Sequence, residues 1–191
     1  MRNLIILNLF FALSTIYAQE WLNEMVTKNP SLMTTPDSLV KVLSSEFQKA
    51  IGKPAPTFSY QCLENDTMKS IGDFQGEVVL VNFWSTNCAG CRYEMPDLSC
   101  LQDSLIEKGF RVLFLSPESK ELLVRYFADN KISGMKGILK PNQLKQPYQI
   151  LAKPSSFIVD RNGIVRDVWI GPLQMNEILK RVSPYLDAKN R

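Results

Sequence analysis

Residues 78–91 read VVLVNFWSTNCAGC, and this stretch decides the fold. Its first half is nearly continuous in apolar residues, which is typical of a strand in a parallel sheet with helices on both faces. Its second half ends in the dithiol Cys88-Ala89-Gly90-Cys91. The apolar residues that follow at helical spacing are Met95, Leu98, Leu101 and Leu105. We therefore expect the dithiol at the first turn of a helix that comes directly after a buried strand.

A dithiol in this position is suited to redox chemistry. The first turn of a helix has unpaired backbone N–H groups and the positive end of the helix dipole, which stabilise an anionic sulfur. The thiolate is the reactive form of cysteine, and such positions lower the thiol pKa from about 8.5 into the range of roughly 3.5–7.5. We expect Cys88, at the helix tip, to attack a substrate disulfide and Cys91, one turn inside, to resolve the mixed disulfide.

The flanking segments complete an α/β domain. Phe58, Tyr60 and Cys62 alternate with polar residues, which predicts a half-buried strand that turns at 64–66 into a short partner strand. A second apolar strand is expected at 110–115, followed by a helix that starts at Ser116-Pro117. Strand, helix, strand and helix in succession predict a right-handed βαβ unit and a parallel sheet.

The rest of the chain predicts a hairpin and a closing helix. Apolar runs on both sides of Arg161-Asn162-Gly163 indicate an antiparallel hairpin. Residues 131–150 show no periodicity, because glycines and prolines interrupt them. The residues expected to face the core from the last two helices are Leu122, Leu123, Tyr126 and Phe127, then Ile178, Leu179, Val182 and Leu186.

Residues 81–96, VNFWSTNCAGCRYEMP, resemble the active-site segment of the TlpA/ResA-like thioredoxins, which are related to the AhpC/TSA redoxins. The resemblance extends from about Ile51 to Leu186 and includes 54–56 and 157–163. It implies a thioredoxin fold, with a central mixed sheet, helices on both faces and an added N-terminal β-hairpin. It also implies an exported thiol–disulfide oxidoreductase that reduces protein disulfides, with roles such as cell redox homeostasis and cytochrome c maturation.

The same resemblance implies the roles of further residues. Glu94 matches an acidic residue that affects proton transfer at the cysteines, and it lies three positions after Cys91. Pro154 matches a cis proline that faces the dithiol, so the Lys153 backbone is expected to pair with an extended substrate segment. Trp84 and Asn87 complete the expected substrate-binding residues. The chain departs from the family in Lys153, in Asn87 and in the pair Ala89-Gly90, which leaves the redox direction open.

The N-terminus predicts export. Residues 1–18 contain a positive residue, a short apolar run and a small residue at the end, as a cleaved signal peptide does; an uncleaved membrane anchor is the alternative. Residues 19–50 are expected to form a helical extension, and 51–191 the thioredoxin-like domain. The expected location is periplasmic or otherwise extracytoplasmic.

Composition limits the partners and cofactors. The chain has no histidine and a formal net charge of +3, which argues against His-based catalysis and against nucleic acid as a partner. We expect no metal and no cofactor besides the redox-active Cys88–Cys91 disulfide. The expected partners are a protein disulfide substrate and a membrane thiol electron donor, and the protein is expected to be a monomer.

Cys62 and Cys100 lie outside the motif. They could form a second disulfide in an oxidising compartment, although two small buried apolar residues are the favoured interpretation. Three other functions stay open on the sequence alone. They are a four-cysteine zinc site, a redox-inert binding module, and a peroxiredoxin-type peroxidase, whose pattern requires proline where this chain has Val81.

Overall fold

The computed structural model describes residues 48–145, 150 and 152–186. The predicted signal peptide (1–18) and nearly all of the predicted helical extension (19–50) lie outside the described residues, so both stay predictions. No helix in the described ranges is long and apolar enough to cross a membrane.

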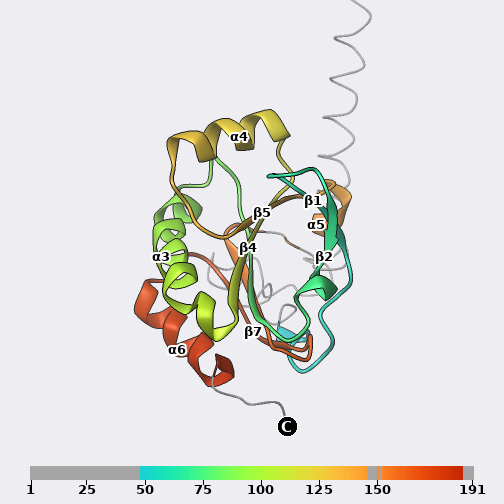
Figure 1. The fold of residues 1–191 in the computed structure, drawn as a ribbon, viewed down its shortest axis with the longest axis vertical. Helices are drawn as coiled ribbons and strands as arrows, with labels where there is room; N and C mark the ends of the chain where they lie inside the picture. The colour runs from blue at the N-terminus through green and yellow to red at the C-terminus, as the bar shows by residue number, and fades with distance from the viewer. Residues whose placement is uncertain (1–47, 146–149, 151, 187–191) are drawn as a thin grey trace, which may run out of the picture. The chain divides into compact units, whose positions relative to one another are not determined.

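The described residues form one seven-stranded mixed sheet (Figure 1) in the order β2-β1-β5-β4-β3-β6-β7. Strands β3, β4 and β5 run parallel, while β1 and β6 pair antiparallel with β5 and β3. The strands are β1 (Ser59–Cys62), β2 (Met68–Ser70), β3 (Val78–Phe83), β4 (Phe110–Ser116), β5 (Met135–Ile138), β6 (Ser155–Val159) and β7 (Val165–Ile170).

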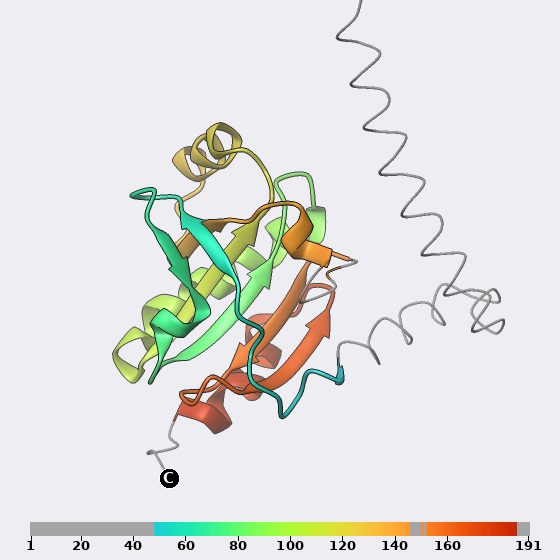
Figure 2. The same ribbon diagram turned by 90° about the vertical axis from the view of Figure 1, so that its right-hand side faces the viewer.

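The helices cover the sheet unequally. They are η2 (Ile71–Phe74), α3 (Ala89–Leu105), η3 (Ile106–Lys108), α4 (Lys120–Asp129), α5 (Asn142–Lys145) and α6 (Met175–Leu186). Figure 2 shows α3 and α6 behind the twisted sheet and α4 at its upper end. Apolar residues of α3, α4 and α6 share one core cluster, while the second cluster, on the other face, is covered by η2, α5 and irregular segments.

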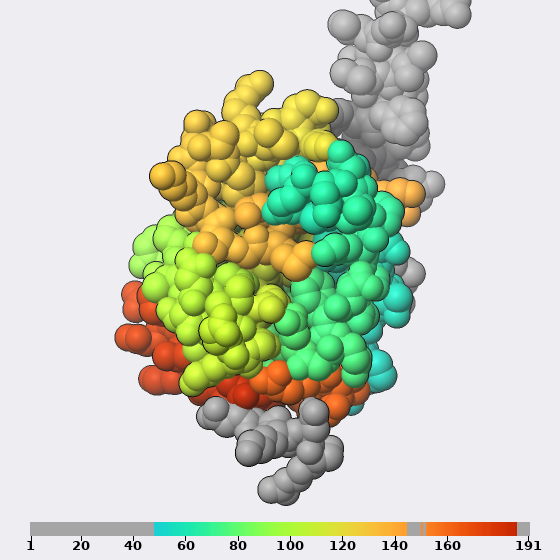
Figure 3. Space-filling view, in the orientation of Figure 1, coloured from blue at the N-terminus to red at the C-terminus, as the bar shows by residue number. Residues whose placement is uncertain are grey.

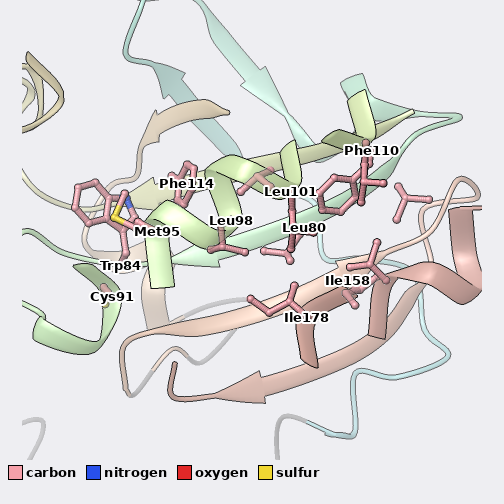
Figure 4. Close-up of a cluster of buried hydrophobic side chains, with 14 of the residues drawn as sticks. Leu80, Trp84, Cys91, Met95, Leu98, Leu101, Phe110, Phe114, Ile158 and Ile178 are labelled. Carbon is pink, nitrogen blue, oxygen red and sulfur yellow. The ribbon is translucent and has the colours of Figure 1, made fainter. Parts of the chain in front are cut away.

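Strand β3 is buried along its whole length, as its apolar run predicted. Met95, Leu98, Leu101 and Leu105 of α3 are all buried, which confirms the helical spacing of the apolar residues after the dithiol. Figure 4 shows the cluster under α3, with Cys91 at the same end as Trp84 and Met95.

Both predicted hairpins are present: β1 pairs antiparallel with β2, and β6 with β7. At the tip of the first hairpin, the Asp66 carboxylate pairs with Lys120 Nζ at the start of α4. In the space-filling view of Figure 3, this hairpin and α4 meet at the upper part of the surface.

Three sequence-based expectations about the helices differ from the structure. Helix α4 begins at Lys120 rather than at Ser116-Pro117, because the Ser119 side chain accepts a hydrogen bond from Leu122 N and caps the helix there. Leu122 and Leu179, expected in the core, have exposed fractions of 40% and 38%. Leu122 lies next to buried Leu123, and Leu179 lies next to buried Ile178, so each is turned about 100° away from the residue of its helix that faces the core.

The sequence does not predict strand β5, because glycines and prolines, Gly137 among them, interrupt the pattern of residues 131–150. A Cβ on Gly137 would lie 2.3 Å from Tyr60 Cδ2 and 2.7 Å from Leu115 Cδ2. The glycine is therefore required in the strand, because side chains of β1 and β4 fill the space beside it.

Candidate active site

The dithiol lies where the sequence predicted it, between the carboxyl end of β3 and the first turn of α3. Cys88 and Cys91 form a disulfide with a Cα–Cα distance of 5.3 Å. Cys88 is the N-cap residue of α3, and its Sγ accepts a hydrogen bond from Cys91 N at 3.1 Å. The sulfur of Cys88 therefore occupies the position in which an N-cap group satisfies an unpaired amide, and a thiolate there gains the same interaction.

The two sulfurs differ in access. Cys88 is half-buried, whereas Cys91 has no exposed surface. A large partner can reach only the first of them. This difference agrees with the predicted order of attack, in which Cys88 meets the substrate and Cys91 acts from inside.

Glu94 lies one turn after Cys91 and is fully buried. Its Oε1 accepts a hydrogen bond from Asn82 Nδ2 at 2.7 Å, and its Oε2 accepts one from Leu173 N at 3.2 Å. Burial raises the pKa of Glu94 to about 7, against the opposing effect of these two hydrogen bonds. A carboxyl group with that pKa can accept or release a proton near neutral pH.

Asn82 connects Glu94 to the next strand. Its Nδ2 also donates to Ser156 Oγ at 3.0 Å, while its buried Oδ1 has no hydrogen-bond partner among the described residues. The side chains of β3, α3 and β6 thus form a polar network inside the apolar core beneath the dithiol. Such a network fixes the Glu94 carboxylate rather than leaving it free to change rotamer.

The peptide bond between Lys153 and Pro154 is cis, as the resemblance implied. Pro154 O accepts a hydrogen bond from Gly171 N at 2.9 Å, which ties this loop to the end of β7. A Cβ on Gly90 would lie 3.4 Å from Pro154 Cδ and 3.3 Å from the Pro172 ring. Two proline rings therefore lie close to Gly90, and the absence of a side chain at this residue permits their approach.

Trp84 does not belong to the binding surface. It is only 1% exposed, and its ring lies 5.0 Å from that of Tyr126 and 5.3 Å from that of Phe127. The prediction that Trp84 contacts a substrate is wrong, because aromatic side chains of α4 cover it. Asn87, in contrast, is exposed beside Cys88, and its Oδ1 accepts a hydrogen bond from Ser85 Oγ at 2.9 Å. Lys153 is half-buried.

The two other cysteines are free. Cys62 is buried, with its Sγ 3.0 Å from Glu64 Oε2, and burial raises the pKa of its thiol. Cys100 is exposed on α3. The interpretation of both as buried apolar residues is therefore correct for Cys62 and wrong for Cys100. No group of three or more potential metal ligands occurs within the described ranges, which contain all four cysteines.

Several polar residues of the site were not predicted. Asn82 and Ser156 lie in fully buried strands. A polar residue within an apolar run was the available signal for Asn82, whereas Ser156 comes just before the apolar run of its strand. Thr86 and Glu118 also meet beside the dithiol: Thr86 N lies 2.8 Å from Glu118 Oε2. Nothing in the local sequence links these two, because their contact depends on the register of β3 against β4.

Proteins of similar sequence indicate the family to which the chain belongs. The thioredoxin-like protein YneN of Bacillus subtilis is 32% identical over 133 residues, which are 69% of this chain and 78% of that protein. The thiol-disulfide oxidoreductase ResA of Bacillus cereus is 31% identical over 145 residues, covering 74% of this chain and 83% of that protein. The resemblance to ResA-like thioredoxins is thereby confirmed.

Solved structures confirm the thioredoxin fold. A thiol:disulfide interchange protein of the thioredoxin family from Chlorobium tepidum TLS aligns with a TM-score of 0.63 and 26% identity, over 72% of this chain and 98% of that chain. A thiol:disulfide interchange protein from Bacteroides sp. aligns with a TM-score of 0.63 and 26% identity, over 70% of this chain and 91% of that chain. The model of the AhpC/TSA family matches residues 51–168, and because this match spans more than half of the sequence, the chain belongs to that family.

Proposed function

We propose that the protein is an extracytoplasmic thiol–disulfide oxidoreductase that reduces disulfides of exported proteins. The observation that carries this proposal is the Cys88–Cys91 disulfide at the N-terminus of α3, with the first sulfur accessible and the second buried. Relatives named thiol-disulfide oxidoreductases support it. The predicted signal peptide supports the location.

The reaction begins with the reduced dithiol. The Cys88 thiolate attacks one sulfur of a substrate disulfide, a mixed disulfide forms, and the other substrate sulfur leaves as a thiolate. Cys91 loses its proton and attacks Cys88 Sγ, so that the Cys88–Cys91 disulfide forms and the second substrate sulfur leaves. Two electrons pass from the dithiol to the substrate, and the disulfide-bonded site is the end state of this half-reaction.

Glu94 accepts the proton that Cys91 releases. It is one turn along α3 from Cys91, its pKa of about 7 suits proton exchange at neutral pH, and its position is fixed by Asn82 and Leu173 N. Cys91 has no exposed surface, so bulk water does not reach its thiol to take the proton. A buried carboxylate that accepts this proton lowers the barrier to the attack of Cys91 on the mixed disulfide.

Lys153, Pro154 and Asn87 form the surface that receives the substrate. An extended substrate segment pairs with the Lys153 backbone, and exposed Asn87, next to Cys88 in the sequence, also contacts the partner. The Lys153 ammonium group adds positive charge near the thiolates and favours them. Return to the reduced state requires a thiol donor, for which a membrane thiol carrier is the fitting class. Monomeric action and a role in cytochrome c maturation complete the proposal.

The test measures how fast this protein, purified and in its reduced form, reduces a second protein that contains a disulfide. The wild type should reduce it stoichiometrically, and both Cys88→Ser and Cys91→Ser should fail to complete the reaction. Cys100→Ser, which removes an exposed free thiol outside the motif and keeps both active-site cysteines, is the control and should retain most of the rate. Hydrogen peroxide is tested in parallel as a substrate. If Cys91→Ser still reduces peroxide, the protein is a peroxidase instead. If the wild type does not reduce the disulfide-containing protein, the function that remains is that of a redox-inert binding module.

A further inference from the structure

A carboxylate outside the dithiol motif contacts the loop that carries Cys88. Glu118 lies between β4 and α4, and it accepts hydrogen bonds from both polar groups of Thr86. Thr86 N donates to Glu118 Oε2 at 2.8 Å, and Thr86 Oγ1 donates to Glu118 Oε1 at 2.9 Å. Each carboxylate oxygen thus takes one donor from the same residue, which fixes the backbone and the side chain of Thr86 together.

The strand register explains why these two residues meet. β3 and β4 are parallel neighbours in which Phe83 pairs with Leu115, so their carboxyl ends lie at the same edge of the sheet. Thr86 and Glu118 each follow their member of that pair by three residues. The contact therefore joins the segments that leave two adjacent strands.

Glu118 is itself held firmly. Ser116 Oγ donates to Glu118 Oε2 at 3.1 Å, and Glu118 N donates back to Ser116 Oγ at 3.3 Å. Ser116 is fully buried at the end of β4, and Pro117 between the two residues has a fixed φ. The carboxylate is anchored to the sheet and is half-buried, so its hydrogen bonds are screened less than those of a surface group.

Thr86 lies inside the turn that ends at the attacking cysteine. Cys88 N donates to Ser85 O at 3.1 Å, which closes a four-residue turn with Thr86 and Asn87 at its centre. A residue that holds Thr86 therefore also holds Cys88 in its N-cap position, where Sγ receives the Cys91 N–H.

We infer that Glu118 is a positioning residue of the dithiol, which clamps the 85–88 turn so that Cys88 Sγ stays at the N-terminus of α3. This inference deepens the proposed function and rests on it for its biological role. The clamp keeps the amide of Cys91 directed at the sulfur after reduction, when no disulfide holds the two residues together. Without it, the turn can move and the thiolate loses part of its stabilisation.

The experiment measures the alkylation of Cys88 by iodoacetamide as a function of pH, in the full chain with Cys91→Ser as background. Site-resolved mass spectrometry separates Cys88 from exposed Cys100, which serves as an internal standard for thiol reactivity. The variants are Glu118→Ala, Glu118→Gln and Thr86→Val. The other charged groups near the dithiol, Arg92, Glu94 and Lys153, are the same in all of them.

Ser119→Ala is the matched control. It removes the N-cap of α4 in the same β4–α4 connection, and so destabilises the fold. It leaves both hydrogen bonds between Thr86 and Glu118 in place. Thermal unfolding of every variant is recorded beside its reactivity.

Glu118→Ala should slow Cys88 alkylation at pH 7 several-fold and move the midpoint of its pH profile upward. Glu118→Gln and Thr86→Val, which each keep part of the hydrogen bonding, should fall between Glu118→Ala and wild type. Ser119→Ala should lower the unfolding temperature and leave the Cys88 profile unchanged. The alkylation of Cys88 needs no disulfide substrate. The inference about Glu118 can therefore hold even if the protein does not reduce disulfides, and it can fail even if the protein does.

Two results overturn the inference. If Glu118→Ala matches Ser119→Ala in Cys88 reactivity, then Glu118 acts only on stability. Where Glu118→Ala does not fold, the same conclusion follows if Glu118→Gln and Thr86→Val match Ser119→Ala. If Glu118→Ala and Glu118→Gln lower the midpoint equally, then its negative charge, and not the clamp, governs Cys88.

Discussion

The carboxyl group of Glu94 lies entirely out of solvent, one helical turn beyond Cys91. The sequence predicted this residue through its spacing from Cys91 and through the family resemblance. It did not predict that Asn82 and Leu173 N hold it, because those partners come from a strand and from a loop 79 residues away. A single residue's identity can therefore be predicted where its chemical environment cannot.

The raised pKa of Glu94 makes stability depend on pH. Its pKa rises from 4.5 to about 7, so between these values the folded protein holds a proton that the unfolded chain has released. The free energy of unfolding should therefore decrease as the pH rises through this window, by roughly 3 kcal/mol from this group. Glu94→Gln should lack this decrease.

Urea unfolding of the wild type and of Glu94→Gln between pH 4.5 and pH 8 measures the effect. The difference between the two proteins isolates Glu94, because the other titrating groups are shared. Parallel curves would contradict the assignment of a raised pKa to this carboxyl group.

At the scale of elements, strand β5 shows how packing determines secondary structure. Gly137 lies beside Tyr60 and Leu115, where a Cβ would be 2.3 Å and 2.7 Å from side-chain carbons. Gly137→Ala should destabilise the protein by about 1–3 kcal/mol or more, because neither neighbour can move without disturbing β1 or β4.

Gly72→Ala is the control for this substitution. A Cβ on Gly72 meets only Ser70 Oγ, at 3.5 Å, which is ordinary contact. The free energy of unfolding of Gly72→Ala, measured with urea, should stay within about 0.5 kcal/mol of that of the wild type. Equal effects of the two alanines would show that crowding at Gly137 does not exclude a side chain.

The elements with strong local patterns were predictable from the sequence. The buried run of β3, the spacing in α3 and the Asn162-Gly163 turn each identify their element without tertiary information. β5 could not be found in this way, because its four residues include a glycine that only the neighbouring strands require. The start of α4 could not be predicted for a similar reason. Whether Ser119 caps a helix depends on how the chain turns after β4, which the local sequence does not determine.

At the scale of the whole molecule, Arg161 joins three segments at the end of the sheet opposite the dithiol. Its guanidinium group donates to Gly76 O at 2.6 Å, to Lys108 O at 2.7 Å and to Leu186 O at 3.1 Å. These carbonyls lie just before β3, at the end of η3 and at the end of α6, so one side chain connects the segment before β3 to η3 and to α6.

Arg161→Ala should destabilise the protein by about 2–3 kcal/mol, because it leaves three carbonyl groups without their charged donor. Arg166→Ala, which removes an exposed pair with Asp160, should cost less than about 1 kcal/mol and serves as the control. Chemical denaturation measures both. A loss for Arg161→Ala no larger than that of Arg166→Ala would contradict the role of Arg161 as a connection between segments.

The trapping of a mixed disulfide tests most directly the central claim that Cys88 attacks the substrate and Cys91 resolves. Reduced Cys91→Ser and reduced Cys88→Ser are each mixed with a disulfide-containing protein, quenched with acid and digested for mass spectrometry. The account predicts a covalent adduct at Cys88 of Cys91→Ser, released by added thiol, and none at Cys91 of Cys88→Ser. An adduct that forms at Cys91 of Cys88→Ser, while Cys88 of Cys91→Ser stays unmodified, would contradict it.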